Sequence, residues 1–206
     1  MENKIISVLL SVATIIFLII VPIMLIGFSQ SSYQSFYYDD FKINAVDQEF
    51  LTNSVLDYIR GVNVAMVPFS PTEISHLDDV QMLIGIAEML FIVSVILLLL
   101  FIPFIWWYKQ NRKLVLQLLF IGSGVAFSFV LMVGVISWFR FEKIFVIFHN
   151  VLFPQGGWEF ASTDLLIMLF PLEVFQFLAS RIFITSISLS AVVLLLSYLF
   201  LYKFNK

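Results

Sequence analysis

The sequence predicts an all-helical integral membrane protein with four transmembrane helices, and three features of its composition support this fold class. Of the 206 residues, 61% are hydrophobic and only 12% are charged, and the mean hydropathy is +1.03. Soluble domains are about 45–50% apolar and about 25% charged. A soluble chain of this length could not bury so much apolar surface, so we expect a lipid bilayer to surround the protein.

Four stretches of the chain are long enough to cross the hydrocarbon core, which takes about 20 apolar residues. We predict a single membrane domain over residues 1–206, with spans at about 5–28, 82–107, 115–139 and 182–202. The first stretch is longer than the roughly 7–15-residue core of a signal peptide, and no small-x-small cleavage site follows it. We therefore expect the first span to remain as an anchor.

Basic residues predict the orientation of the spans, because cytoplasmic loops carry an excess of lysine and arginine. They cluster in the connection between the second and third spans and in the tail, at Lys109, Arg112, Lys113, Lys203 and Lys206. The loop at about 29–81 is acidic by comparison. We therefore predict cytoplasmic termini and two extracytoplasmic loops, at about 29–81 and 140–181.

Both predicted outside loops contain segments that we expect at the membrane surface. In the first loop, apolar residues at Phe50, Leu51, Val55 and Ile59 predict an amphipathic helix over 46–60 that ends at Gly61. Before that helix, an aromatic segment reads as interfacial, with Tyr33, Phe36, Tyr37, Tyr38 and Phe41. In the second loop, Pro171 and Glu173 interrupt the apolar stretch 165–179, so we expect an interfacial or re-entrant segment rather than a fifth span.

Charge and cysteine content exclude several classes of function. The net charge of −3 leaves no basic stripe to neutralise phosphates, which argues against a nucleic-acid partner. The absence of cysteine excludes disulfides, thiol catalysis and cysteine-ligated metal sites. A zinc site would be the competing use of histidines and acids, but no His-Glu-x-x-His or similar ligand spacing occurs. We therefore expect no metal and no cofactor.

The first of the two histidines lies in the segment FSPTEISHLDDVQ, residues 69–81. This segment reads as a helix start with Thr72 as the cap. Glu73, His76 and Asp79 then share one helix face, and a carboxylate three residues from a histidine can accept its ring N–H. That arrangement suits a general base, but spacing alone favours a simpler alternative, a solvated acidic helix start.

The second histidine lies in FVIFHNVLFPQGGWEF, residues 145–160. In a helix beginning near Phe141, the residues Glu142, Phe145 and His149 share a face. A structural histidine explains this segment as well as a functional one. Both histidines nevertheless fall in predicted outside loops, and the chain lacks a Gly-x-Ser-x-Gly motif, which suggests acid–base chemistry without a covalent intermediate.

Glu88 lies inside the second predicted span. An acid in a membrane span is a functional candidate by default, although a partner on another span or simple protonation would make it structural. A transporter is therefore a third possibility, but the spans hold few polar residues that could form a path.

Two ordered motifs surround the histidines. The first, E-x-x-H-L-x-D-V, comprises Glu73, His76, Leu77, Asp79 and Val80. The second runs from F-H through F-P, a glycine turn and W-x-F to D-x-x-I-x-L-F-P, at Phe148, His149, Phe153, Pro154, Gly157, Trp158, Phe160, Asp164, Ile167, Leu169, Phe170 and Pro171. This pair of motifs, with the four-span layout, resembles the lipoprotein intramolecular transacylase family of bacterial membrane proteins over nearly the whole chain.

The resemblance implies an acyl transfer in the bacterial cell membrane, with the active site at the extracytoplasmic face. The substrate would be a lipoprotein whose N-terminal cysteine bears a diacylglyceryl thioether and a free α-amine. One acyl chain would move from the sn-2 ester oxygen to that amine and give an N-acyl lyso-form lipoprotein. The implied partners are diacylglyceryl-modified lipoproteins and membrane lipids.

The implied reaction needs a base, an oxyanion donor and an acid. We assign His76, backed by Asp79 or Glu73, as the base. His149 would then polarise the ester carbonyl or protonate the leaving oxygen, and the reverse division of roles stays open. Supporting roles are expected for Asn150, Trp158 and Asp164.

Each supporting residue also has a structural alternative. Trp158 would serve as an interfacial anchor, and Asp164 would cap a helix. The alternative function for the whole chain is a non-enzymatic membrane protein that binds a lipid or a partner through its outside loops.

Overall fold

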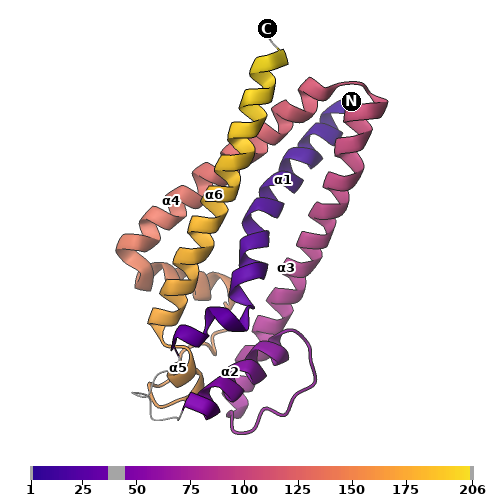
Figure 1. The fold of residues 1–206 in the computed structure, drawn as a ribbon. Helices are drawn as coiled ribbons and strands as arrows, with labels where there is room; N and C mark the ends of the chain where they lie inside the picture. Colours follow the sequence, from indigo (N-terminus) through magenta and orange to yellow (C-terminus); the bar gives the residue numbers. More distant parts are fainter. Residues whose placement is uncertain (1, 37–44, 205–206) are drawn as a thin grey trace. The chain divides into compact units, whose positions relative to one another are not determined.

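The computed structural model describes residues 2–36 and 45–204, and every regular element in these ranges is helical. The elements are α1 (Glu2–Gly27), η1 (Gln30–Ser32), η2 (Gln34–Phe36), α2 (Ala45–Ile59), α3 (Pro71–Pro103), η3 (Phe104–Tyr108), α4 (Arg112–Leu152), α5 (Leu165–Leu169) and α6 (Leu172–Phe204) (Figure 1). Four predictions concern residues outside the described ranges, at Tyr37, Tyr38, Phe41 and Lys206.

Four helices are long and apolar enough to cross a membrane, which confirms the predicted all-helical class with four spans. They are α1, α3 with its π-helical continuation η3, α4 and α6. At about 1.5 Å per residue, the 33 residues of α3 extend about 50 Å, which exceeds the roughly 30 Å thickness of the hydrocarbon core. The ends of the longer helices must therefore extend beyond the predicted spans.

The chain divides into two compact units, which are described separately. Unit 1 comprises Met1–Met24, Glu88–Val135 and Ile182–Lys206. Unit 2 comprises Leu25–Ala87 and Ile136–Arg181, and it contains both histidines.

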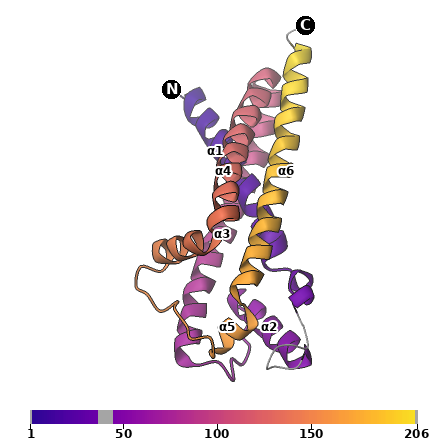
Figure 2. The same ribbon diagram turned by 90° about the vertical axis from the view of Figure 1, so that its left-hand side faces the viewer.

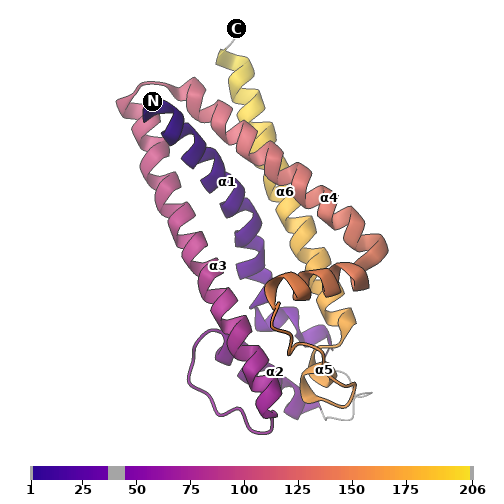
Figure 3. The same ribbon diagram turned by 180° about the vertical axis from the view of Figure 1, so that it is seen from behind.

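Unit 1 is a helical bundle in which apolar side chains and small residues mediate the contacts. Leu10, Ile105, Val115 and Leu118 form a buried cluster between α1, η3 and α4. The rings of Phe17 on α1 and Phe91 on α3 stack at 6.1 Å, and the two helices run side by side in Figures 1 and 3. The side chain of Glu88, on α3, is exposed in this unit.

Gly122 marks the closest approach of α4 to α1. A Cβ atom at this position would lie 2.9 Å from the Ser11 carbonyl oxygen and 2.9 Å from the Thr14 Cβ. Small residues allow this kind of close backbone packing between membrane helices. One of these two neighbouring atoms, the Ser11 carbonyl oxygen, belongs to the backbone of α1. A larger residue at position 122 could therefore be accommodated only if α1 moved.

In unit 2, α4 changes direction at Arg140, whose backbone leaves the helical region with φ −142° and ψ 39°. The following segment, residues 141–152, is helical and carries His149 (orange in Figure 3). The sequence predicted a helix beginning near Phe141, and the structure confirms it.

The amphipathic helix predicted at 46–60 is confirmed as α2, with one difference in its buried face. Leu51, Val55 and Ile59 are buried as predicted, but Phe50 is 68% exposed and Leu56 is buried instead. The predicted face is therefore wrong at Phe50, and Leu56 takes its place on the buried face. Helix α2 contacts α5, which lies near it in Figures 1 and 2. Gly61 follows the helix end with φ +82°, a conformation that favours glycine.

The interfacial or re-entrant placement of 165–179 stays a prediction. The stretch is interrupted at Pro171, as the sequence indicated, and among the described residues it forms no fifth candidate span. Its first part is the short helix α5, which ends at Leu169, and its second part is the beginning of α6. Phe170 leaves the helical region with φ −127° and ψ 65°. The residue before a proline disfavours the helical conformation, so Pro171 separates the two helices.

We predict that Gly122→Ala destabilises the protein, because the added methyl group would overlap the backbone of α1. Overpacking of this kind should reduce the free energy of unfolding by about 1–3 kcal/mol. Thermal unfolding of the protein in detergent micelles measures the effect. Gly124→Ala is a matched control on the same helix, because its new Cβ would meet only Leu194 Cδ1, at 3.5 Å. Equal stability of the two variants would contradict the prediction.

Candidate active site

Helix α3 begins with a capping box that fixes the position of His76 one turn later. The Glu73 N–H donates to Ser70 Oγ at 3.3 Å, and the Ser70 N–H donates to Glu73 Oε2 at 2.8 Å. This reciprocal pair defines Ser70 as the cap, with Pro71 at the first helical position, where proline is favoured. The prediction of Thr72 as the cap is therefore wrong. A capping glutamate acts three residues after the cap, which points to Ser70.

The same glutamate also holds α5 against α3. Glu73 Oε1 accepts the Leu166 N–H at 2.7 Å, near the start of α5, and the Glu73 side chain is only 3% exposed. Both carboxylate oxygens therefore accept backbone donors at helix starts, where N–H groups lack partners within the helix. The structure brings Glu73 to these backbone groups rather than to the His76 ring.

The two histidines, 73 residues apart in sequence, face each other in unit 2. The ring centroids of His76 and His149 lie 6.2 Å apart with an interplanar angle of 30°. His149 is 8% exposed, and its Nδ1 lies 2.8 Å from the Phe145 carbonyl oxygen. A carbonyl oxygen can only accept, so Nδ1 carries the hydrogen. The neutral His149 ring therefore has its lone pair on Nε2.

A glycine turn brings the aromatic residues after α4 onto both histidines. We call residues 153–160 the site loop. Phe153 is buried, and its ring centroid lies 4.9 Å from that of His76 and 5.6 Å from that of His149. Gly156 and Gly157 have φ values of +78° and +83°, which side chains rarely adopt.

The later aromatic residues of the site loop complete the surroundings of the pair. Trp158 lies 4.8 Å from His149 and Phe160 lies 5.6 Å from His76, measured between ring centroids. The imidazoles are thus surrounded largely by aromatic rings, an environment that disfavours their charged forms.

Both histidines lie outside the predicted spans, and burial lowers the pKa of each. For His76, burial lowers the pKa, the nearby His149 lowers it further, and the Asp79 carboxylate opposes the shift. For His149, burial lowers the pKa and the hydrogen bond to the Phe145 carbonyl opposes it. Their ordinary value is about 6.5, so both rings are expected to be neutral at neutral pH. A neutral ring can accept a proton, as a base must.

Asp79 lies one turn beyond His76 on α3 and bonds to the site loop. Gln155 Nε2 donates to Asp79 Oδ2 at 2.8 Å. Asp79 thus affects His76 through its charge, while its hydrogen bond goes to Gln155. Sequence reasoning did not identify Gln155, and its only signal was its place in the Pro-Gln-Gly-Gly turn.

The three residues predicted to support the histidines have different surroundings in the structure. Trp158 contacts the His149 ring, as a supporting residue should. Asn150 is exposed on α4. Asp164 precedes α5, and its Oδ2 accepts the Ala161 N–H at 2.7 Å, so its side chain shapes the turn before that helix. Among the described residues, no group of three or more histidines and acids is arranged to hold a metal ion.

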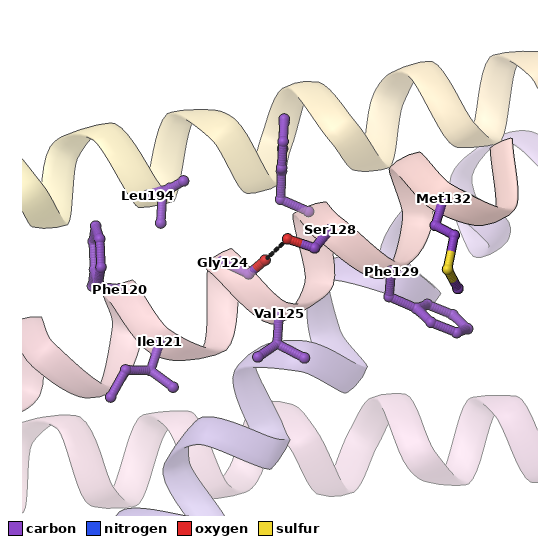
Figure 4. A pocket seen from close by; sticks show the side chains of 9 residues that line it. Phe120, Ile121, Gly124, Val125, Ser128, Phe129, Met132 and Leu194 are labelled. Atoms are coloured by element: carbon purple, nitrogen blue, oxygen red, sulfur yellow. Dashed lines mark hydrogen bonds between the residues drawn. The ribbon is translucent and has the colours of Figure 1, made fainter. Parts of the chain in front are cut away.

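An apolar groove of about 690 Å³ lies elsewhere, in unit 1, on α4 and beside Leu194 of α6 (Figure 4). Its one hydroxyl lining group, Ser128 Oγ, donates to the Gly124 carbonyl oxygen at 2.9 Å. The groove contains none of the predicted site residues, and its lining is open and largely apolar.

Comparisons with known proteins agree with this geometry. Residues 3–175 match the protein family described as lipoprotein intramolecular transacylase Lit. An in meso structure of the membrane integral Lit from Bacillus cereus has a TM-score of 0.86 and 20% sequence identity, covering 99% of this chain and 97% of that one. The structure of a histidine-to-arginine variant has a TM-score of 0.72 and 18% identity, covering 99% and 93%. At these identities the likeness shows the fold.

An uncharacterized protein from Aquifex aeolicus (strain VF5) is 27% identical over 113 residues. The match covers 51% of this chain and 45% of that protein, so it extends over less than half of the relative's length.

We predict that Glu73→Ala destabilises unit 2, because it leaves the partly buried N–H of Ser70 and the buried N–H of Leu166 without their acceptor. Each lost acceptor costs about 1–3 kcal/mol, so the free energy of unfolding should fall by about 2–6 kcal/mol. Thermal unfolding in detergent measures it. The exposed Glu142 provides the control, since Glu142→Ala should change stability by no more than about 0.5 kcal/mol. A Glu73→Ala variant as stable as Glu142→Ala would refute this role.

We predict that both histidines titrate below about pH 6.5. The chain has only two histidines, so NMR spectra of histidine-labelled protein contain two sets of imidazole signals. Asp79→Asn should lower the pKa of His76 further, because the carboxylate no longer stabilises the imidazolium. Asp78→Asn removes the neighbouring acid, which accepts a hydrogen bond from Tyr58, and should have the smaller effect. An increased pKa of His76 in Asp79→Asn would reverse the predicted sign.

Proposed function

The chain belongs to the lipoprotein intramolecular transacylase (Lit) family, and we propose that it transfers an acyl chain within a bacterial lipoprotein. The substrate has an N-terminal cysteine with a diacylglyceryl thioether and a free α-amine. The sn-2 acyl chain moves from its ester oxygen to that amine, and the product is an N-acyl lyso-form lipoprotein. The observation that supports this chemistry most directly is the pair of imidazoles 6.2 Å apart within the matched region, with His149 buried and His76 partly buried.

His149 is the better candidate for the base. The substrate amine has a pKa of about 7.7–8.0, so at neutral pH it must lose a proton before it can attack an ester. The hydrogen bond from His149 Nδ1 to the Phe145 carbonyl leaves the lone pair on Nε2 and fixes the ring orientation. The same carbonyl stabilises the ring after it has taken the proton. This favours the reverse of the roles that sequence spacing suggested.

His76 then acts as the donor to the reacting ester. Its Nδ1 is buried and has no hydrogen-bond partner within the described ranges. A buried N–H without an acceptor is rarer in proteins than an unpaired acceptor, so the proton belongs on Nε2. An Nε2–H group can polarise the ester carbonyl and donate to the oxyanion that develops on it.

The proton and the acyl group then follow a balanced path. The substrate ammonium first releases one proton to solvent. The neutral amine nitrogen then forms a bond to the sn-2 carbonyl carbon as His149 Nε2 takes its second proton. The tetrahedral intermediate collapses with cleavage of the carbon–oxygen bond, and the His149 imidazolium returns the proton to the departing glycerol oxygen. No water is consumed. Donor and acceptor belong to one molecule, so much of the orientation entropy is already met by the substrate.

The proposed site lies at the extracytoplasmic face of the bacterial cell membrane. The distribution of lysine and arginine supports cytoplasmic termini and outside loops at 29–81 and 140–181. Exposed apolar residues on the segment 141–152 support contact with membrane lipids, including Ile147, Phe148 and Val151. Such contact would hold the imidazoles near the depth of the ester carbonyls.

We predict that purified protein moves the acyl chain of a diacylglyceryl lipopeptide onto its amine. The transfer conserves mass, so tandem mass spectrometry must locate the chain on nitrogen. His149→Ala should reduce the rate by about 10²–10⁴-fold and His76→Ala by about 10²–10³-fold. Glu142→Ala, at an exposed position, should retain the rate.

The two possible failures of this experiment have different meanings. If the wild-type protein transfers nothing to an authentic substrate in detergent or lipid, the proposed function is wrong. If both histidine variants transfer at the wild-type rate, the function stands and the proposed site is wrong.

A further inference from the structure

The Asp79 carboxylate lies one helical turn from His76 and has a side-chain hydrogen bond to Gln155. Gln155 Nε2 donates to Oδ2 at 2.8 Å, and Asp79 is close enough to His76 for its charge to act on that ring. An ionised carboxylate has about four lone-pair sites, so it can accept further donors. Asp79 is also partly exposed, whereas His149 is buried.

We propose that Asp79, oriented by Gln155, binds the α-ammonium group of the substrate before it is deprotonated. The inference rests on the acyl transfer proposed for this chain, and it assigns the polar contact that selects a free amino terminus. Gln155 is then a positioning residue, because it acts on the substrate through Asp79.

The chemistry of the substrate requires such a group. At neutral pH an α-amine with a pKa of about 7.7–8.0 is mostly protonated, so it arrives as a cation. The histidines and the aromatic rings around them supply no full negative charge. A carboxylate within one helical turn of His76 provides it, and charge-assisted hydrogen bonds are the strong ones.

Three other acids of unit 2 have hydrogen-bond partners that make them less suitable for this role. Both oxygens of Glu73 accept backbone N–H groups in a buried position. Asp78 points toward Tyr58, whose hydroxyl donates to it. Asp164 accepts the Ala161 N–H at the turn before α5. Asp79 differs from these three acids because its hydrogen-bond partner, Gln155, belongs to the site loop.

Gln155 fixes the direction of the Asp79 carboxylate. It lies on the turn that the positive φ angles of Gly156 and Gly157 define. Phe153, two residues before Gln155, is anchored to the end of α4, because its N–H donates to the His149 carbonyl oxygen at 2.7 Å. The amide of Gln155 is therefore held by the same short stretch of chain that packs against both imidazoles.

The proton transfer leaves Asp79 unchanged. The ammonium binds as a cation and releases one proton to solvent. The neutral amine then attacks the ester, and its second proton passes to His149 Nε2 and on to the glycerol oxygen. Asp79 takes no part in this transfer, so its contribution lies in binding and in placing the nitrogen.

The test compares two lipopeptides that cannot react, because ether-linked dialkylglyceryl chains replace the esters. One has a free α-amine and the other is N-acetylated, and each displaces a fluorescent lipopeptide from the full-length protein in lipid nanodiscs. The wild-type protein should bind the free amine about tenfold more tightly, as expected for one charge-assisted contact at a partly exposed site. Asp79→Asn should remove most of this preference, and Gln155→Ala should reduce it.

Asp78→Asn is the matched control, because it removes the adjacent acid and should keep the preference. A general loss of structure would weaken binding of both lipopeptides and leave their ratio unchanged. Equal binding of the two lipopeptides by the wild-type protein would overturn the proposal, as would full preference in both Asp79→Asn and Gln155→Ala. If acyl transfer occurs but the preference is absent, only the role of Asp79 fails. If authentic substrate gives no transfer, the proposed function itself fails.

Discussion

The buried carboxylate of Glu73 is the interaction on which the arrangement of unit 2 depends. It accepts the Ser70 N–H at the start of α3 and the Leu166 N–H at the start of α5, 93 residues later in the chain. Helix starts leave N–H groups without intrahelical partners, and a negative charge there is favourable. The Glu73 side chain therefore fixes where α3 begins, and hence where His76 lies. It also holds α5, which follows the site loop in the chain, against the start of α3.

For each of the two imidazoles, the surrounding aromatic rings and a nearby oxygen act on the pKa in opposite directions. The rings of Phe153, Trp158 and Phe160 pack against the pair and favour its neutral form. The Phe145 carbonyl and the Asp79 carboxylate act in the other direction, on His149 and His76 respectively. A base needs both effects, since it must be free of its proton at rest and able to hold one during the reaction.

The sequence was sufficient for features that depend on local pattern. Apolar length predicted the four long helices, near-helical spacing predicted α2, and the two motifs drew attention to His76 and His149. Features that depend on contacts between distant residues were not accessible in this way. Asp79 and Gln155 are 76 positions apart, and no spacing rule links them. The cap of α3 was accessible in principle, because Ser70 precedes Glu73 by the three residues of a capping box, but Thr72 beside the proline was chosen instead.

The division of roles between the histidines shows why such contacts matter for mechanism. Once the family resemblance implied acyl transfer, His76 was assigned as the base because acids lie three residues on either side of it. In the folded chain, one of those acids is committed to backbone groups and the other to Gln155. The partner that orients an imidazole is instead a backbone carbonyl four residues before His149, within its own helix. A carbonyl that accepts from Nδ1 specifies the tautomer without adding a charge to the site. We therefore propose that the ring with fewer acids near it in sequence accepts the proton, and that the acid beside the other ring meets the cationic substrate.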